Sequence, residues 1–435
     1  MKFKKLAALG LVSSLLFAAA ACGDDDDSDS TKGDGDSSSD ALAAPSKDTK
    51  ATLRVWLNGP DTPQDMRDWA IAEFKKQYPN VTVKIEEQEW DGLVPRLTTA
   101  LDSADTPDIV EMGNTQAQEF EAAGALTDLS SKLDELGGDD LLESLKEAGS
   151  YNEQFYGLPL YAGARVVTYR TDLFEKSKLE VPTTLDEFVE AGKKLQKDNA
   201  STPNFSGIYF PGRNWQAMLS FIWDAGGDIA TQSDGEWTGT LTDKESVDGL
   251  TTVQDIMKNA NKAPADSDDR NDYIDFCANE VGMLMGPGWK QGQIEEECPA
   301  LKGKLGVFPL PGSDGDVAPS FLGGSVLGLS AKGKNQGLAY QFLKLINGDE
   351  FQTQYAENSL IPNKKSLLDK VAGSPGALAQ AEAAENSRFT PSSEFWAQVE
   401  GDNILQDMGT QIGNGDDVEK AASTANDAIV EILNQ

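Results

Sequence analysis

Carboxylates are the most abundant side chains in this sequence that could do chemistry. The 435 residues include 72 Asp and Glu and 37 Lys and Arg but no His, for a net charge of −35. The lack of His excludes Ser-His-Asp triads, Cys-His pairs and most transition-metal sites. A glycosidase needs only two carboxyl groups at a fixed separation. With so many acidic residues a pair can always be nominated, so a carboxylate-only hydrolase and a binding protein both stay open.

The excess of acidic residues limits the partners that the protein can bind, and the length of the chain limits the number of domains. Nucleic-acid binding depends on Lys and Arg contacts to phosphates, so we expect no nucleic-acid partner. An anionic membrane surface is disfavoured for the same reason. At roughly 150 residues per domain, the chain is long enough for two or three domains.

Residues 1–21 have the layout of a secretory signal peptide, with a basic start, an apolar stretch and small residues before Cys22. The apolar stretch is shorter than the ~20 residues of a membrane span. Ala19-Ala20-Ala21-Cys22 resembles a bacterial lipobox, with Ala19 where Leu or Val is usual. We therefore expect a lipid on Cys22, which would attach an exported protein to the outer face of the cytoplasmic membrane. A soluble secreted protein with an unrelated Cys22 is the alternative.

The segment after Cys22, up to residue 50, is rich in Asp, Ser and Gly and lacks aromatic residues. Such a composition cannot bury enough apolar surface to offset the entropy of ordering, so residues 22–50 are predicted to be a disordered acidic linker. An acidic run could also bind calcium, but a solvated, self-repelling spacer is favoured.

Cys277 and Cys298 are the two cysteines left in the body of the chain. An even pair in an exported protein predicts one disulfide bond. Two separate buried thiols are the alternative.

Strand and helix patterns alternate along the rest of the chain, which predicts βαβ units on a largely parallel sheet. Thr184-x-x-Glu187 reads as a capping box that opens a helix. Breaks rich in Pro and Gly at Leu158–Gly163 and Pro309–Gly324 suggest that one lobe is inserted into another. The predicted strands are Thr52–Leu57, Val81–Glu86, Pro107–Val110, Arg165–Tyr169, Val281–Met285 and Lys304–Val307. The predicted helices lie over residues 66–78, 93–101, 184–195, 214–225 and 246–259.

Five segments, in this order, resemble extracellular solute-binding protein family 1, the sugar-binding components of bacterial ABC importers, including maltose- and trehalose-binding proteins. They are TLRVWLNG, PDIVEMGNTQAQEFEAAGALTDL, YGLPLYAGARVVTYRTDLF, GMLMGPGW and SFLGGSVLGLS. The resemblance runs from about Leu53 to the C-terminus. It implies an α/β fold of the periplasmic-binding-protein-like type II, with two α/β lobes around a ligand cleft joined by a hinge.

The resemblance also implies lobe boundaries and a function. Lobe 1 would comprise residues 51–160 and about 320–365, and lobe 2 about 161–319 and 366–435. The protein would capture a mono- or oligosaccharide between the lobes and deliver it to an ABC-type membrane permease. We expect a monomer, without enzymatic activity, cofactor or metal.

Aromatic side chains are the first requirement of a sugar site, because the C–H faces of a sugar ring stack on flat apolar surfaces. Trp289 matches the family's stacking Trp, and Gly286 and Gly288 would let the backbone approach the ligand. Trp215 and Trp223 lie eight residues apart on one predicted helix and roughly share a face, so one could contact the ligand while the other is core. Trp396 lies where the family supplies another aromatic. A purely structural role is the alternative for each.

Polar groups around the sugar are the second requirement. The resemblance assigns this role to loops after the first and third strands, to the crossover and to a C-terminal segment. At the position two residues beyond Tyr161, where many members carry Asp or Glu, this chain has Gly. The candidates are Asn58, Asp61, Asn114, Thr115, Gln116, Tyr161, Arg165 and Arg388.

Other function classes stay open at this point. A binding protein of the same fold could take a polyol, a phosphorylated polyol or an oxyanion. Oxyanion sites favour helix N-terminal amides and few aromatics, so the tryptophans favour a sugar. A carboxylate-only glycosidase and an adhesion or sensory lipoprotein are further alternatives.

Overall fold

The computed structural model describes residues 41–59, 61–90, 92–269, 272–358, 360–371 and 373–435. The predicted signal peptide, Cys22 and most of the acidic linker lie outside the described residues. Within those ranges, no helix is both long and apolar enough to span a bilayer.

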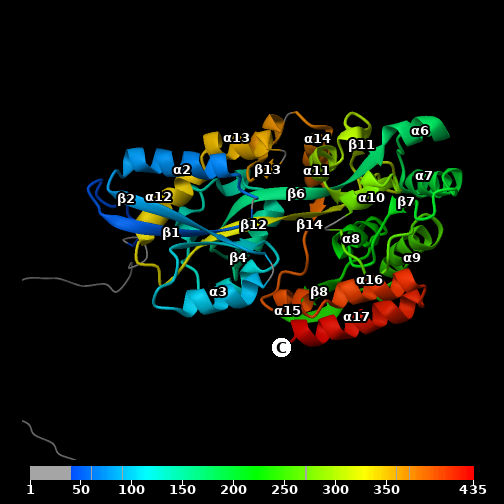
Figure 1. The fold of residues 1–435 in the computed structure, drawn as a ribbon. Coiled ribbons are helices and arrows are strands. Elements are labelled where there is room, and N and C mark those ends of the chain that lie inside the picture. Colours follow the sequence, from blue (N-terminus) through cyan, green and yellow to red (C-terminus); the bar gives the residue numbers. More distant parts are fainter. Residues whose placement is uncertain (1–40, 60, 91, 270–271, 359, 372) are drawn as a thin grey trace, which may run out of the picture. The chain divides into compact units, whose positions relative to one another are not determined.

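A ten-stranded mixed sheet runs through the described part of the chain (Figure 1). Its main path has the order β2-β1-β3-β12-β6-β10-β7. The pairs β1–β2, β1–β3 and β10–β7 are parallel, whereas β12 and β6 pair antiparallel with their neighbours on the path. The strands are β1 Ala51–Asn58, β2 Val81–Gln88, β3 Ile109–Gly113, β6 Gly157–Arg170, β7 Ser206–Tyr209, β10 Val281–Pro287 and β12 Ser320–Leu329. The expectation of a largely parallel sheet is therefore wrong at its centre.

Short strands complete the β-structure. β11 (Leu305–Phe308) and β13 (Ile361–Pro362) pair with β6, and β14 (Ser387–Arg388) pairs with β12. Two separate hairpins are β4–β5 (Ser150–Tyr151, Gln154–Phe155) and β8–β9 (Ala230–Ser233, Glu236–Gly239).

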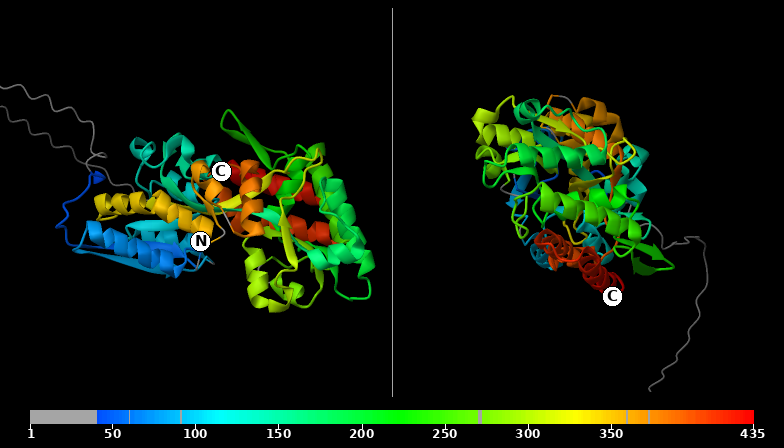
Figure 2. Two further views of the ribbon diagram at one scale, coloured as in Figure 1. Left: turned by 90° about the horizontal axis from the view of Figure 1, so that it is seen from above. Right: turned by 90° about the vertical axis from the view of Figure 1, so that its right-hand side faces the viewer.

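Helices pack at both ends of the main sheet. In Figure 2 the gold α12 lies beside the blue α2, and the red C-terminal helices lie among green segments, in agreement with the contacts of α12 with α2 and of α17 with α9. The helices nearest β1 are α2 Gln64–Gln77, α3 Leu93–Asp102, α4 Ala117–Ala122, α5 Glu143–Ala148, α12 Gln336–Ile346 and α13 Asp349–Glu357. The others are α6 Thr171–Ser177, α7 Leu185–Asp198, α8 Trp215–Asp224, α9 Lys244–Asn259, α10 Tyr273–Cys277, α11 Lys290–Glu297, α14 Pro375–Glu385, α15 Trp396–Gly401, α16 Ile404–Asn414 and α17 Val418–Leu433.

Two large hydrophobic cores divide the described residues. One joins Leu53, Val55, Phe74 and Phe342, and we call the elements around it the first lobe. The other joins Phe188, Ile222, Val253, Met283 and Trp396, and we call the elements around it the second lobe. The residue boundaries given above for the lobes stay a prediction.

The local signals explain why the helices begin and end where they do. Leu93, Leu97 and Leu101 are buried on α3, as their spacing of four residues predicts. Thr184 is the N-cap of α7, and its hydroxyl accepts a hydrogen bond from the Glu187 amide. The Glu187 carboxylate accepts from the amide and hydroxyl of Thr183 at 2.9 Å and also interacts with the amide of Thr184, so the predicted capping box extends one residue earlier.

β6 and β12 connect the two lobes as long antiparallel neighbours. β6 contributes Leu158 and Leu160 to the first core and Val167 to the second. The segment Leu158–Gly163, which the sequence suggests is a break, lies inside β6, and a register shift in β12 occurs where it faces Pro159. The extra residue is Leu160 of β6, which forms a β-bulge next to Pro159, a residue that has no N–H to donate to the ladder.

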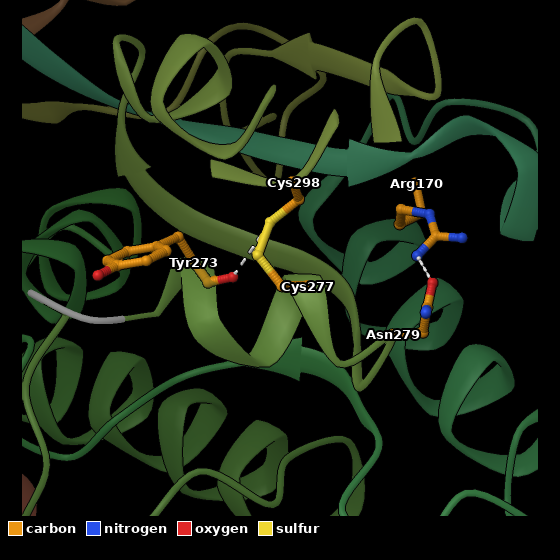
Figure 3. The surroundings of a disulfide bond; sticks show 5 residues. All are labelled: Arg170, Tyr273, Cys277, Asn279 and Cys298. Carbon is orange, nitrogen blue, oxygen red and sulfur yellow. Dashed lines mark hydrogen bonds between the residues drawn. A yellow bond between two sulfur atoms is a disulfide. The ribbon is translucent and has the colours of Figure 1, made fainter. Parts of the chain in front are cut away.

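A disulfide joins Cys277 at the end of α10 to Cys298 just after α11 (Figure 3). The two Cα atoms are 5.4 Å apart. The Sγ atom of Cys298 lies 3.7 Å from the backbone oxygen of Tyr273. The cross-link encloses β10, the turn that carries Trp289, and α11.

Candidate functional site

Two of the predicted site residues, Tyr161 and Asn114, lie at the middle of β6 and β12. Gly163 of β6 stands opposite Gly323 of β12, and Tyr161 stands opposite Ser325. The loop after β3 reaches this stretch because the Asn114 side-chain amide donates to the backbone oxygen of Leu322 at 2.8 Å. These contacts bring the loop after β3 and the two connecting strands to one place.

Asp61 is held by two donors from different elements. Its Oδ2 accepts hydrogen bonds from the Tyr161 hydroxyl at 2.8 Å and from the Trp90 indole N–H at 2.7 Å. The Tyr161 ring packs against Tyr355 with centroids 5.3 Å apart, and burial raises its pKa well above the usual value. Tyr161 is therefore a neutral donor, while Trp90 stays 37% exposed.

Asn58 lies in a fully buried polar network below this group. Its backbone N–H donates to Oε2 of Glu111 at 2.7 Å, and the Ser325 hydroxyl donates to Oε1 of the same carboxyl at 2.6 Å. Burial raises the pKa of Glu111 to about 7, although both hydrogen bonds favour the charged form. Asn58 and Glu111 therefore hold β1, β3 and β12 together, so Asn58 stabilises the strands beneath the site.

The loop after β3 divides its three candidates between different contacts. Asn114 is buried, and its side-chain N–H group bonds to backbone as described above. Thr115 makes a side-chain hydrogen bond to Glu400 of the second lobe. The buried Oε1 of Gln116 has no hydrogen-bond partner among the residues that the structure describes. Gln116 is therefore the member of this loop with a free acceptor.

Trp215 and Trp396 form an aromatic cluster with Phe321 of β12. The Trp215 centroid lies 5.5 Å from that of Phe321 and 6.4 Å from that of Trp396. The Trp396 N–H donates to Glu400 at 2.8 Å, and burial raises the pKa of that carboxyl. Trp396 is 1% exposed and Trp215 is 5% exposed, so both belong to the core in this conformation.

Trp289 is the exposed aromatic of the set, with 40% of its surface accessible. It follows β10 at the turn that the sequence predicts. Both glycines of this turn are closely packed against other parts of the protein. A side-chain Cβ at position 288 would lie 2.4 Å from the Gly376 backbone oxygen, and one at position 286 would lie 3.0 Å from the Leu284 side chain. The expected approach of a ligand to the backbone of Gly286 and Gly288 stays a prediction.

Two ion pairs, one partly buried and one fully buried, lie beside the Trp289 turn. Arg165 binds Asp269 at 2.6 Å, and Lys290 binds Asp272 at 2.7 Å. Burial raises the pKa of Asp272 to about 6 against the opposing effect of Lys290. For Asp269, burial also acts upward, but the charges of Arg165 and Lys290 outweigh it and the pKa ends below its usual value.

Trp223 and Arg388 form a separate group around Asp228. The Arg388 guanidinium donates to Asp228 at 2.8 Å and lies 5.5 Å from the centroid of the Trp223 ring. The Trp223 N–H donates to the same carboxylate at 3.1 Å. Arg388 lines a cavity of about 750 Å³ beside α5 and α14, and no other predicted site residue lines it.

Sequence reasoning did not nominate Trp90, Glu400 and Gln380. Trp90 and Glu400 bond directly to the predicted residues Asp61 and Trp396. The side chain of Gln380 packs against both Gly163 and Gly288. It fills the space that a side chain would need at either position, 3.2 Å from a Cβ at 163 and 2.6 Å from one at 288. Glu400 follows Trp396 by four residues, a helical spacing that could have identified it. The other two depend on contacts distant in sequence.

Comparison with known proteins gives consistent matches. The model of the family described as bacterial extracellular solute-binding protein matches residues 59–353. The chain is 32% identical over 428 residues to the diacetylchitobiose binding protein DasA of Streptomyces coelicolor, covering 97% of this chain and 96% of that protein. It is 22% identical over 385 residues to an arabinooligosaccharide-binding protein of Halalkalibacterium halodurans, covering 85% of this chain and 81% of that protein.

Solved structures share the fold. The GacH receptor of Streptomyces glaucescens has a TM-score of 0.77 at 21% identity, covering 89% of this chain and all of that chain. The sugar-binding protein MalE of Xanthomonas citri also has a TM-score of 0.77, at 20% identity, covering 88% of this chain and 97% of that chain. The expected two-lobed binding-protein fold is thus confirmed.

Proposed function

We infer the function of this chain from its family and its site: it belongs to the bacterial extracellular solute-binding proteins, and we propose that its solute is a sugar. The observation that carries the proposal is the exposed indole of Trp289, whose turn adjoins β6 and the uncharged side chain of Gln380: Pro287 pairs with Arg165, and Gln380 lies close to both Gly288 and Gly163. A sugar ring has apolar C–H faces and a rim of hydroxyls, which match an aromatic surface and uncharged donors and acceptors.

The charges near Trp289 favour an uncharged solute over an oxyanion. Arg165 and Lys290 are each paired with an Asp. An anionic ligand would have to break one of these pairs and leave a carboxylate buried without its partner, which is strongly unfavourable. A polyol or phosphorylated polyol is the alternative solute, and it belongs in the same binding test.

A thermal-shift and calorimetric panel tests the solute class. We take N,N′-diacetylchitobiose as the first probe because DasA, which is 32% identical, is named for this sugar. The panel adds maltose, an arabinooligosaccharide, glycerol 3-phosphate and inorganic phosphate. Binding stabilises the folded state by RT ln(1 + L/Kd), where L is the free ligand concentration, so the melting temperature rises with the logarithm of ligand concentration once the site is saturated. A rise with at least one saccharide is expected, and a rise confined to the phosphates would refute the sugar proposal. Release of cleaved sugar during incubation would contradict the proposed absence of enzymatic activity.

We further propose export and attachment to the membrane through Cys22, which the leader sequence supports. The Cys277–Cys298 disulfide suits an oxidising compartment. In this proposal the two lobes, divided at the predicted boundaries, close on the sugar, and the monomeric closed form delivers it to an ABC permease. Mass spectrometry of membrane-extracted protein would show a diacylglyceryl-modified Cys22 at the N-terminus, and an unmodified secreted chain would contradict the anchor.

A further inference from the structure

Lys290 occupies an unusual place next to the exposed Trp289. Its Nζ atom lies 5.3 Å from the centroid of the Trp289 ring, although the two residues are adjacent in sequence. The residue is only 2% exposed, whereas lysines are almost never fully buried unless they are paired. A buried ammonium group therefore covers one face of an otherwise accessible indole.

Two acceptors from the preceding loop hold this ammonium group. It donates to Oδ1 of Asp272 at 2.7 Å and to the backbone oxygen of Asp269 at 2.5 Å. Asp272 is itself 1% exposed. Removing two such charges from water costs several kcal/mol per ion, so a buried pair is weak evidence for a role in stability alone. Another role is needed to account for its position.

A second pair links this arrangement to the strand between the lobes. Asp269 binds Arg165 of β6 at 2.6 Å, and Arg165 stands opposite Pro287 in the pairing of β6 with β10. A row of alternating charges thus leads from β6 to the turn that carries Trp289. Its members, in order, are Arg165, Asp269, Lys290 and Asp272. The turn that carries the indole is fixed to β6 by side chains as well as by the sheet.

We propose that Lys290 is a positioning residue for ligand binding: its ammonium group, held by Asp272 and Asp269, covers one face of Trp289 and fixes the other face toward the sugar. This inference rests on the proposed sugar-binding function. A cation against an aromatic face contributes roughly 0.5–2 kcal/mol, depending on how far it is removed from water. An indole held in this way loses little further freedom when a sugar ring stacks on its open face.

A double-mutant cycle tests the proposal. Lys290→Gln combined with Asp272→Asn removes both charges while keeping a neutral hydrogen-bonding pair, so no unpaired charge is left buried. We expect Kd for N,N′-diacetylchitobiose, or for the saccharide that binds best in the panel, to rise roughly 3- to 30-fold, the equivalent of 0.5–2 kcal/mol. The same double substitution in a Trp289→Ala background should leave Kd unchanged, because the proposed effect acts through the indole.

Two further measurements separate positioning from general structure. Acrylamide quenching of the Trp289 emission, taken as the difference from Trp289→Phe, should increase when the charges are removed. The control Arg170→Gln/Asp172→Asn removes an ion pair between the end of β6 and the start of α6, in which Arg170 is buried and also bonds Asn279, and it should lower stability without changing Kd. The proposal is overturned if the Lys290 variant binds the saccharide like wild type, or if its loss is equal in the Trp289→Ala background. If wild type binds no saccharide, the proposed function fails instead.

Discussion

At the residue scale, Trp289 is the side chain on which the sugar proposal depends most directly. Trp289→Ala should weaken saccharide binding by at least ~1 kcal/mol, the scale of one buried aromatic contact. Because the rest of its surface is covered, in part by the Lys290 ammonium group, its removal should also lower the melting temperature, so Kd is measured well below the unfolding transition. Trp289→Phe is the matched control, since it keeps a flat ring. Calorimetry measures Kd, and an unchanged affinity in the Ala variant would remove Trp289 from the site.

Glu111 makes stability depend on pH through a single buried carboxyl group. Its pKa is raised from 4.5 to about 7 in the folded protein, chiefly by burial. Between these values the folded chain keeps a proton that the unfolded chain has released, so the contribution of Glu111 is complete below pH 4.5 and is lost as pH rises through about 7. The full change is about 3 kcal/mol.

Comparing wild type with Glu111→Gln isolates this effect. The free energy of unfolding of wild type relative to the variant should fall between pH 4.5 and pH 8, measured by urea denaturation. Glu86→Gln gives the opposite sign, because hydrogen bonding to Arg54 lowers the pKa of Glu86 to about 2. Its contribution is present above pH 4.5 and is lost as pH falls toward 2. A Glu111 difference that does not vary with pH contradicts the assignment.

At the scale of elements, the Cys277–Cys298 cross-link should stabilise the segment that carries Trp289. It closes a loop of 21 residues, for which loss of chain entropy in the unfolded state predicts roughly 3 kcal/mol. The Cys277→Ser/Cys298→Ser variant should unfold at a correspondingly lower urea concentration. Thiol titration of the denatured wild-type protein gives the necessary control, and two free thiols there would show that the bond does not form.

Individual helices in both lobes could be predicted from sequence because their signals are local. The spacing of Leu93, Leu97 and Leu101 gives α3, and Thr184 gives the start of α7. The sequence predicts only Arg165–Tyr169 of the long strand β6, since Pro159 and Gly163 read locally as a break. They lie in a strand because β12 and β13 pair with β6 from distant parts of the chain.

The candidate site shows the same limit. The Trp289 turn is a contiguous motif, so the sequence reveals it. Its support by Lys290 and Asp272 depends on a contact across 18 residues, and the bond from Gln118 to Ser392 spans 274 residues. Sequence spacing carries no information about such pairs. Residue types could be nominated for the site, but their partners could not.

At the scale of the whole molecule, contacts between the lobes should respond to ligand. Thr115 of the first lobe bonds Glu400 of the second, and Tyr151 bonds Glu394 at 3.3 Å. A sugar that contacts both lobes should favour arrangements in which they are close. Small-angle scattering should therefore show a smaller radius of gyration on saturation with N,N′-diacetylchitobiose. Equal radii with and without bound sugar would contradict closure.

The antiparallel pairing of β6 with β12 has a mechanical consequence. Two strands hydrogen-bonded side by side form a ribbon, and a ribbon bends easily out of its plane but resists shear within it, because shear would break the register. Gly163 and Gly323 face each other in this ribbon, where no side chains stiffen it. We therefore expect movement between the lobes to flex the sheet at this glycine pair, and a bulky residue at either position should hinder that motion.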